Sequence, residues 1–310
     1  MIVLAVDGGA TKTTLTLKET DGQELFSATL TGSNYQAIGS EHVEHVFDAL
    51  LDDAGKAVAD RNIAVAVFAV AGIDTAEDER IVRSIVESCM SRSVFTVGQL
   101  IVENDVASTL LGLADGRPAS LLIAGTGAVC FSYNGKNLVR AGGWGHRAGD
   151  EGSGYWIGRQ IAKAVFRSAD GRAEPTRLTK LVLEANQLDG IEALMNWLYR
   201  EDYTNARLAS LSSHLQPAVE QGDATAMGIA RKAADELALL ATAVLQKVGH
   251  AGEDHSFYIN GGVLKNIQPI HDLFTEKVKE IFPAVQFEPC EEKPIEYIVK
   301  RTENLARLVR

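Results

Sequence analysis

A pattern of three short strands that occurs twice constrains the fold of this chain more than any other feature. The first copy reads IVLAV, a turn at 7–10, TKTTLTLKE, an Asp-Gly turn, and QELFSATL. The second copy starts at Ser120 and reads SLLIA, the turn GTG, AVCFSY, an Asn-Gly turn, and KNLVRA. Asp-Gly and Asn-Gly between alternating apolar residues are strong hairpin signals. Because a long internal repeat usually decides the architecture, we expect two similar lobes.

The segments after each copy predict an α/β fold. Residues 64–73 read as a buried strand, 76 to about 90 as a crossover helix, and QLIVEND at 99–105 as another strand. The second copy is more helical. Its expected helices are 153–169, 175–187, 190–200, 204–221, 223–249 and 264–281, its later strands 255–261 and 284–289, and a last helix covers 295–310. We expect lobes at 1–117 and 118–292, with the last helix, from about 293, joined to the first lobe and a ligand in the cleft between them.

Composition is typical of a folded protein. The chain has 310 residues, of which 46% are hydrophobic and 23% charged, enough for one large or two medium domains. No run approaches the roughly eighteen apolar residues of a membrane helix, and MIVLAVDGG lacks the basic region of a signal peptide, so we expect a cytoplasmic protein. Three dispersed cysteines predict neither a disulfide framework nor a zinc site. The net charge of -11 argues against nucleic acid as a partner, but not against a nucleotide held by backbone amides.

Three glycine turns each follow a short apolar run: IVLAVDGGATKT, LLIAGTGAV and FYINGGVLKN. Glycine lets backbone N–H groups approach an anion, and neighbouring threonines add donors. The first turn is not a Walker A loop, because Lys12 is followed by the alternating residues of a strand rather than by a helix. A single turn of this kind is more often a plain hairpin turn, whereas three in a duplicated fold favour phosphate binding.

The segment GGWGHRAGDEGSGYWIG at 142–158 holds seven glycines beside acidic and aromatic residues. A plain connection needs one or two turn glycines, so this loop is expected to wrap a small polar ligand. A hexose would require convergent donors and acceptors together with an apolar plate for its ring. The loop contains both kinds of group.

These motifs carry a resemblance. DGGATKT, AGTGAV and INGGVLKN resemble the first phosphate, second phosphate and adenosine motifs of the superfamily that joins sugar kinases, heat-shock chaperone ATPases and actin. ENDVAS at 103–108 and the 142–158 loop resemble the N-acetylglucosamine kinase branch, which includes the BadF/BadG/BcrA/BcrD ATPases. The resemblance covers nearly the whole chain. It implies a duplicated ribonuclease-H-like (actin-like ATPase) fold, and an enzyme that uses ATP and Mg²⁺ to phosphorylate the 6-hydroxyl of N-acetylglucosamine or a close relative.

The resemblance also implies other activities and a partner. Glucosamine and N-acetylmuramic acid are alternative substrates. An ATPase activator of a dehydratase or reductase, with an iron–sulfur cluster bridging its subunits, and a protein that binds ATP without chemistry are alternative functions. Homodimers are expected in this family.

The resemblance assigns the nucleotide to the three turns. Asp7 would hold Mg²⁺ through water, although an aspartate at such a turn can be purely structural. The residues expected to contact ATP are Thr11, Lys12, Thr13, Gly125, Thr126, Gly127, Gly261, Gly262 and Lys265. For the last of the three motifs, the alternative is a strand-to-helix turn that binds nothing.

Asp105 is the candidate general base, at the point where a buried strand gives way to a helix. Its alternative role is a helix N-cap, which Asn104 could equally provide. By resemblance, the sugar would contact Asn34, Asp105, Gly143, Trp144, Gly145 and Asp150. Trp144 could instead belong to the core. Four neighbours have other expectations. Tyr155 and Trp156 pack the following helix, and His146 is structural or supports the residues that contact the sugar. Glu151 favours the helix dipole whether or not it touches ligand.

The C-terminal helix departs from the family pattern. Ile295, Glu296 and Tyr297 stand where small residues are expected, which leaves the packing of this helix open. Its basic residues read most simply as a solvated helix face: Lys300, Arg301, Arg307 and Arg310.

Overall fold

The computed structural model describes residues 1–249 and 255–308, and within these ranges it contains two five-stranded sheets with helices packed on them. Two compact units share the chain. Unit 1 comprises Met1–Arg117 with Glu291–Arg310, and unit 2 comprises Pro118–Cys290. No helix of the described residues is both long and apolar enough to cross a bilayer.

The sheet of unit 1 joins an antiparallel hairpin meander to parallel strands. In sheet order the strands are β3 (Glu24–Thr31), β2 (Lys12–Glu19), β1 (Ile2–Gly8), β4 (Asn62–Val70) and β5 (Thr96–Asn104). β1 runs antiparallel to β2 and parallel to β4, and β4 runs parallel to β5. The helices are α1 (Tyr35–Ile38), α2 (Ser40–Ala57), α3 (Ala76–Arg92), α4 (Asp105–Ala114) and α13 (Pro294–Leu308).

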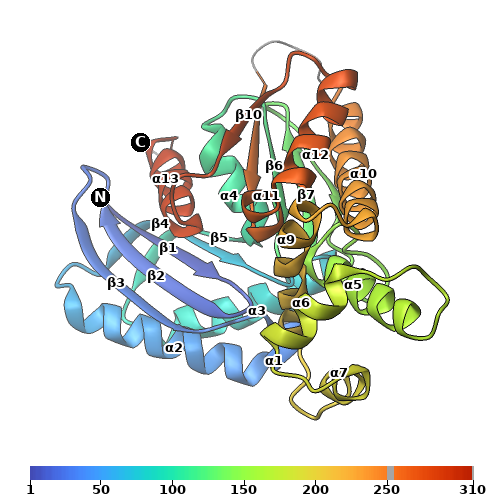
Figure 1. The fold of residues 1–310 in the computed structure, drawn as a ribbon. Coiled ribbons are helices and arrows are strands. Elements are labelled where there is room, and N and C mark those ends of the chain that lie inside the picture. Colours follow the sequence, from blue (N-terminus) through green and yellow to red (C-terminus); the bar gives the residue numbers. More distant parts are fainter. Residues whose placement is uncertain (250–254, 309–310) are drawn as a thin grey trace. The chain divides into compact units, whose positions relative to one another are not determined.

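Helices cover both faces of this sheet (Figure 1). Leu4 and Val6 of β1 pack with α2 and α3, whereas Val3 and Ala5 pack with α13. Every residue of β1 is buried. A strand covered on both faces reads as a continuous apolar run, which is why IVLAV shows no alternation.

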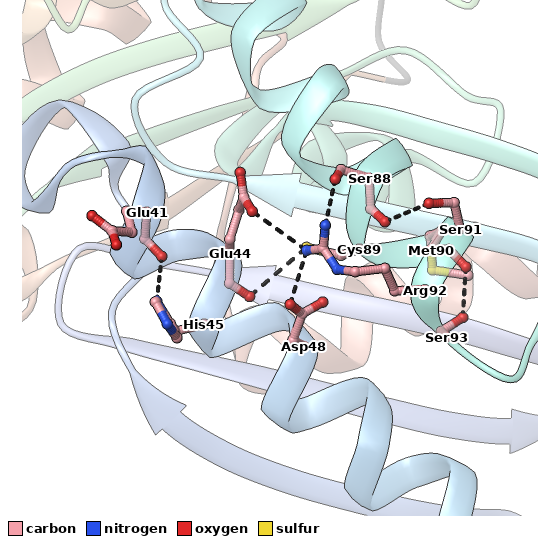
Figure 2. Close-up of polar contacts among 10 residues, drawn as sticks. All are labelled: Glu41, Glu44, His45, Asp48, Ser88, Cys89, Met90, Ser91, Arg92 and Ser93. Atoms are coloured by element: carbon pink, nitrogen blue, oxygen red, sulfur yellow. Dashed lines mark hydrogen bonds and ion pairs between the residues drawn. The ribbon is translucent and has the colours of Figure 1, made fainter.

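Arg92 joins α3 to α2 at the edge of this layer (Figure 2). Its guanidinium lies 2.8 Å from the Asp48 carboxylate and 3.4 Å from that of Glu44. The Cys89 thiol lies beside it and donates to the Glu44 carbonyl oxygen at 3.8 Å. Because these ion pairs are partly exposed, they contribute little stability compared with the apolar residues beneath them.

Unit 2 repeats the same topology. In sheet order its strands are β8 (Leu138–Gly142), β7 (Ala128–Tyr133), β6 (Ala119–Ala124), β9 (Ser256–Asn260) and β10 (Gln286–Pro289). Again three strands are antiparallel, and the next two continue the sheet in parallel. The helices, shown in Figure 1, are α5 (Gly154–Ala169), α6 (Arg177–Ala185), α7 (Ile191–Leu198), α8 (Asn205–Ser210), a 3₁₀ turn (Leu211–His214), α9 (Leu215–Glu220), α10 (Ala224–Lys247), α11 (Gly262–Asn266) and α12 (Gln268–Ile281). The predicted duplicated α/β fold is therefore confirmed.

The structure contains a helix that was missed, and two helical predictions need correction. α2 was not predicted, although residues 43, 46, 47, 50, 51 and 54 recur at helical spacing and are buried. The single helix expected over 204–221 is divided by the 3₁₀ turn. The helix expected over 264–281 is interrupted at Ile267, and Pro269 lies in the first turn of α12, where a missing N–H is tolerated.

The C-terminal helix belongs to unit 1 and packs closely on α4. A side chain at Gly112 would overlap the Tyr297 backbone, so the small residue of this contact lies on α4 and not on α13. The expectation of a solvated basic face is wrong for Arg301, which is largely buried in a two-bond ion pair with Glu103 at 2.6 and 3.0 Å. Arg310 lies outside the described residues.

Candidate functional site

Two carboxylates of unit 1 lie at the same edge of its sheet. The register aligns Gly8 with Val70 and Val70 with Asn104. Asp7 therefore lies at the end of β1, and Asp105 follows the end of β5. The carboxyl ends of parallel strands are where α/β sheets commonly bind ligands.

The structure shows which of two adjacent residues caps α4. The Asn104 side chain accepts hydrogen bonds from the N–H groups of Val106 and Ala107, both at 3.0 Å. Its amide nitrogen donates to the Ile73 carbonyl oxygen at 3.2 Å. Asn104 therefore caps α4, so the helix does not depend on Asp105 for its cap.

Burial raises the pKa of both carboxylates, and the charge of Asp7 adds to the effect on Asp105. Burial, and next the charge of Asp7, raise the pKa of Asp105 to about 7. Burial raises the pKa of Asp7 to about 6, against an opposing effect of Lys12. A carboxyl group that titrates near neutral pH can accept a proton from a substrate, and such perturbed groups gather at functional sites.

The first glycine turn exposes only part of its predicted set. The Gly9 N–H donates to the Lys12 carbonyl oxygen at 2.9 Å and closes the turn, and the side chains of Thr11 and Lys12 are exposed. Thr13 is fully buried. It pairs with Gly8 and lies two residues before Leu15, on the same face of the strand, so its side chain lies on the α2 and α3 side of the sheet, opposite to Asp7. Its side chain is not available to a phosphate there, contrary to expectation.

Asn34 caps α1, because its side chain accepts from the Gln36 N–H at 3.1 Å. It packs so closely on Gly72 that a Cβ there would lie 2.6 Å from the Asn34 Oδ1 atom. Gly72 also has a φ of 88°, which favours glycine. Asn34, half-buried, thus lies against the loop that follows β4.

In unit 2 the GTG turn is held by the start of α5. The Gly125 carbonyl oxygen accepts from the Gly154 N–H at 2.7 Å, and the Thr126 carbonyl oxygen accepts from the Tyr155 N–H at 3.2 Å. Ser153 caps α5 by accepting from the Trp156 N–H. The end of the glycine-rich loop therefore fixes the turn that precedes β7.

The second and third glycine turns meet in one cavity of 410 Å³ within unit 2. Thr126 and Gly262 both line it. A side chain at Gly261 would overlap the backbone of Ala124, so this glycine permits the ends of β9 and β6 to approach. The full lining is Gly125, Thr126, Gly154, Ala206, Ala209, Ser210, Ser212, Ser213, Gly262, Val263, Asn266 and Ile267.

Lys265 is not part of this cavity. The short helix α11 turns Val263 and Asn266 toward it, whereas Leu264 and Lys265 line a separate cavity of 310 Å³ beside β10. Val263 and Asn266 are three residues apart and share a face of this helix. The expected grouping of Lys265 with Gly262 is therefore not observed.

Sequence reasoning missed the residues that α8 and the following 3₁₀ turn bring to the cavity. These are Ser210, Ser212 and Ser213. Asn266 of α11, which also lines the cavity, was missed as well. The serine-rich run LASLSSHLQP was the available signal, because serines interrupt an amphipathic helix and carry hydrogen-bonding groups.

The glycines of the 142–158 loop are needed for its backbone. Gly143 and Gly145 have φ angles of 70° and 77° on either side of Trp144. Trp144 is 64% exposed, and the Arg140 guanidinium lies 4.7 Å from its ring centre. The core alternative for Trp144 is excluded, and the ring forms an apolar plate at the surface of unit 2.

Asp150 lies beside the GTG turn. It is nearly buried, has a φ of 61°, and accepts from the Ala128 N–H at 3.2 Å. A Cβ at Gly127 would lie 3.1 Å from its Oδ1 atom. His146 makes a 2.9 Å contact with Asn205 and packs on Tyr155, as expected of a structural residue.

Comparison with known proteins identifies the family. Residues 4–290 match the BadF/BadG/BcrA/BcrD ATPase family. The chain belongs to this family. It is 33% identical over 287 residues to an N-acetylmuramic acid/N-acetylglucosamine kinase of Clostridium acetobutylicum, and 29% identical over 301 residues to an N-acetyl-D-glucosamine kinase of Dictyostelium discoideum. Each alignment covers 92% of this chain and 92% of the relative.

A solved structure has the same fold as this chain. It is that of a candidate N-acetylglucosamine kinase from Chromobacterium violaceum, with a TM-score of 0.71 and 23% identity. The superposition covers 97% of this chain and 98% of the other.

Proposed function

We propose that this protein is an ATP-dependent amino-sugar kinase that phosphorylates the 6-hydroxyl of N-acetylglucosamine or a close relative. The observation that carries the proposal is Asp105, at the carboxyl end of the sheet of unit 1 with a pKa of about 7. The two curated relatives that are named kinases of amino sugars support it. We further propose that units 1 and 2 are the two lobes of the kinase.

The unit 2 cavity is the proposed site for the adenosine end of ATP. Its 410 Å³ fall within the range of ligand pockets, and its walls combine glycine backbone with serine and asparagine side chains. Thr126 would contact the phosphates from unit 2, and the exposed Thr11 and Lys12 from unit 1. Thr13 would contribute backbone only. Lys265 is left out of the set because it lines the other cavity.

Asp7 fits the role of a magnesium carboxylate. It is nearly buried near a strand end, where burial raises its pKa to about 6, and a bound cation would stabilise its charged form. Within the described residues, no three acidic, histidine or cysteine side chains gather into a metal cage. Mg²⁺ typically binds one or two carboxylates together with water and substrate phosphates, so Asp7 could hold it through water. The ion would neutralise charge on the transferring phosphate.

Residues of both units are proposed to bind the sugar. Trp144 would supply the plate for a ring face, and the backbone at Gly143 and Gly145 would meet hydroxyls. Asn34 would contribute from unit 1. The Asp150 carboxylate, which accepts from the Ala128 N–H just after the GTG turn, is proposed to accept from a sugar hydroxyl as well.

Asp105 would accept the hydrogen bond of the acceptor hydroxyl and align it with the γ-phosphate. Phosphoryl transfer proceeds through a loose transition state, so alignment matters more than early removal of the proton. The proton then passes to the carboxylate as the oxygen–phosphorus bond forms. A carboxyl group with a pKa of about 7 suits this exchange near neutral pH.

A substrate panel tests the proposal. ADP release would be measured with N-acetylglucosamine, N-acetylmuramic acid, glucosamine, glucose and no sugar, and the phosphorylated carbon assigned by ³¹P NMR. We expect ADP to form with an N-acetylated amino sugar and phosphate to appear at carbon 6. ADP formation at one rate with and without sugar would indicate an ATPase and overturn the proposal.

The iron–sulfur alternative is not favoured. Cys89, Cys130 and Cys290 are all buried, and they lie on α3, on β7 and after β10. A cluster shared between subunits would need cysteines close together at a surface. A cytoplasmic homodimer is proposed from the resemblance alone, and light scattering would test the dimer.

A further inference from the structure

Asp78 receives five hydrogen bonds from two segments of unit 1. The first group of three forms an N-terminal cap for α3. The Asp78 Oδ2 atom accepts from the Asp74 N–H at 3.1 Å, from the Thr75 N–H at 2.7 Å and from the Thr75 hydroxyl at 2.7 Å. The Thr75 hydroxyl in turn accepts from the Asp78 N–H, completing a capping box. An aspartate with only this role would leave Oδ1 to solvent.

The other oxygen of Asp78 binds the segment that carries Asn34. Oδ1 accepts from the Tyr35 hydroxyl and, at 3.2 Å, from the Gln36 side-chain amide. The same Gln36 amide donates to the Gly72 carbonyl oxygen at 3.1 Å. Asp78 is only 7% exposed, so these bonds form where water competes weakly.

One of the two segments that Asp78 joins carries Asn34, and the other contacts both Asn34 and the residue before Asp105. Asn34 precedes Tyr35 directly and packs on Gly72. The carbonyl oxygen of Ile73, next in that loop, accepts from the Asn104 side chain, and Asn104 caps the helix that begins with Asp105. The loop at 72–75 therefore lies between the residue proposed to bind the sugar and the residue proposed to accept its proton.

We propose that Asp78 is a positioning residue for the sugar acceptor: by fastening residues 34–36 to the loop at 72–75, it fixes Asn34 relative to Asp105. This inference rests on the proposed function. Asp78 itself touches neither substrate nor the reacting atoms. Losing its contacts would let Asn34 move, and small displacements of positioning groups reduce catalysis strongly.

The charge of Asp78 is constant over the working range. Burial raises its pKa, but the hydrogen bonds from Tyr35, Thr75 and Gln36 outweigh that effect and lower the pKa to about 2. Its contribution to sugar binding should therefore not vary between pH 5 and pH 9. Any pH dependence in that range belongs to other groups.

Two variants and a matched control test the inference. Tyr35→Phe removes one bond to Oδ1 and leaves the capping box intact. Asp78→Asn disturbs both sets of bonds. The control is Asp223→Asn in unit 2. Asp223 is also 7% exposed, caps α10 by accepting from the Ala226 N–H, and accepts from Thr176 and Arg177 at the start of α6.

We expect Tyr35→Phe and Asp78→Asn to raise the KM for the sugar by roughly tenfold while the KM for ATP stays within about twofold. Asp223→Asn should lower the melting temperature and leave both KM values within about twofold. An unchanged sugar KM in Tyr35→Phe would overturn the inference, even if Asp78→Asn failed to fold. Equal changes in the KM for sugar and ATP, or a sugar effect as large in Asp223→Asn, would also overturn it.

The proposed function can fail separately. If the wild-type protein phosphorylates none of the sugars, the function fails before any variant is compared. Hydrogen exchange then still reports on the contact itself. Tyr35→Phe should speed amide exchange in residues 33–38 and 72–75 and leave the rest of unit 1 unchanged, and unaltered exchange there would show that Asp78 does not fasten the two segments.

Discussion

At the scale of single residues, the position of Asp105 suits the proposed proton transfer, but its ionised carboxylate destabilises the fold. Its neighbour Asn104 supplies the helix cap, so the carboxylate of Asp105 does not serve the cap. Burial and the charge of Asp7 make its ionised form costly. Functional sites commonly keep such groups at the expense of stability.

This cost predicts a pH-dependent effect of Asp105→Asn. The unfolded chain releases this proton near pH 3.8, whereas the folded chain holds it up to about 7, so the group lowers the free energy of unfolding as pH rises between these values. The variant should therefore be more stable than the wild type at pH 8, by on the order of 2 kcal/mol after allowing for solvent access. The difference should fade toward pH 4.

Urea unfolding at pH 8, 6 and 4 measures that difference. A constant stability gain at all three values would show that the carboxyl group does not titrate with a raised pKa.

At the scale of elements, the contact between α4 and α13 shapes unit 1. Gly112 lets the two helices approach, and Arg301 of α13 pairs with Glu103, two residues before Asp105. The C-terminal helix thus supports the strand end that carries the proposed base. The large residues Ile295 and Tyr297 are accommodated because the small residue lies on the opposite helix.

Gly112→Ala tests this packing. The added methyl would overlap the Tyr297 backbone, which cannot move without shifting α13, so we expect a loss of about 2 kcal/mol in the free energy of unfolding. Gly228→Ala is the control, because its helical position in α10 has open space around the added Cβ. It should gain about 0.5–1 kcal/mol from helix propensity. Equal effects of the two substitutions would contradict the close contact.

At the scale of the whole molecule, the duplicated topology gives the two copies different tasks. Unit 1 carries the carboxylates Asp7 and Asp105 at the ends of β1 and β5, whereas in unit 2 the strands β6 and β9 end in glycine turns that meet at a cavity. We infer that unit 2, the copy with more helices, binds the adenosine end of the nucleotide. Nucleotide should then stabilise the protein by mass action.

Gly262→Val tests that assignment. An added Cβ would meet only the Asn266 amide, at 3.5 Å, and Gly262 lines the cavity, so we expect the fold to be kept while part of the cavity is filled. ADP at 100 times its Kd should add about 2.7 kcal/mol to wild-type stability and much less to the variant. Thermal unfolding with and without ADP measures this. An undiminished ADP effect in Gly262→Val would place the nucleotide elsewhere.

The sequence predicted the repeat, the strands and the glycine turns because these depend on local signals. It did not predict which way side chains face at the start of a strand, and so it grouped Thr13 with Lys12. It also could not show that Lys265 and Asn266, neighbours on a short helix, line two different cavities. The Asp78 contacts join residues that are distant in the chain, and no periodicity records such a pair. The Asn104 cap was open to prediction but undecided, because two adjacent residues could equally fill it.

The most direct test of the central claim is steady-state kinetics of Asp105→Asn with the preferred sugar and ATP. Removing the base should lower kcat by about 10²–10⁴-fold, with the KM for ATP nearly unchanged. In the wild type, kcat/KM should rise with pH to a plateau above about 7, as Asp105 loses its proton. Near-normal kcat in Asp105→Asn would remove this residue from the mechanism and contradict the account.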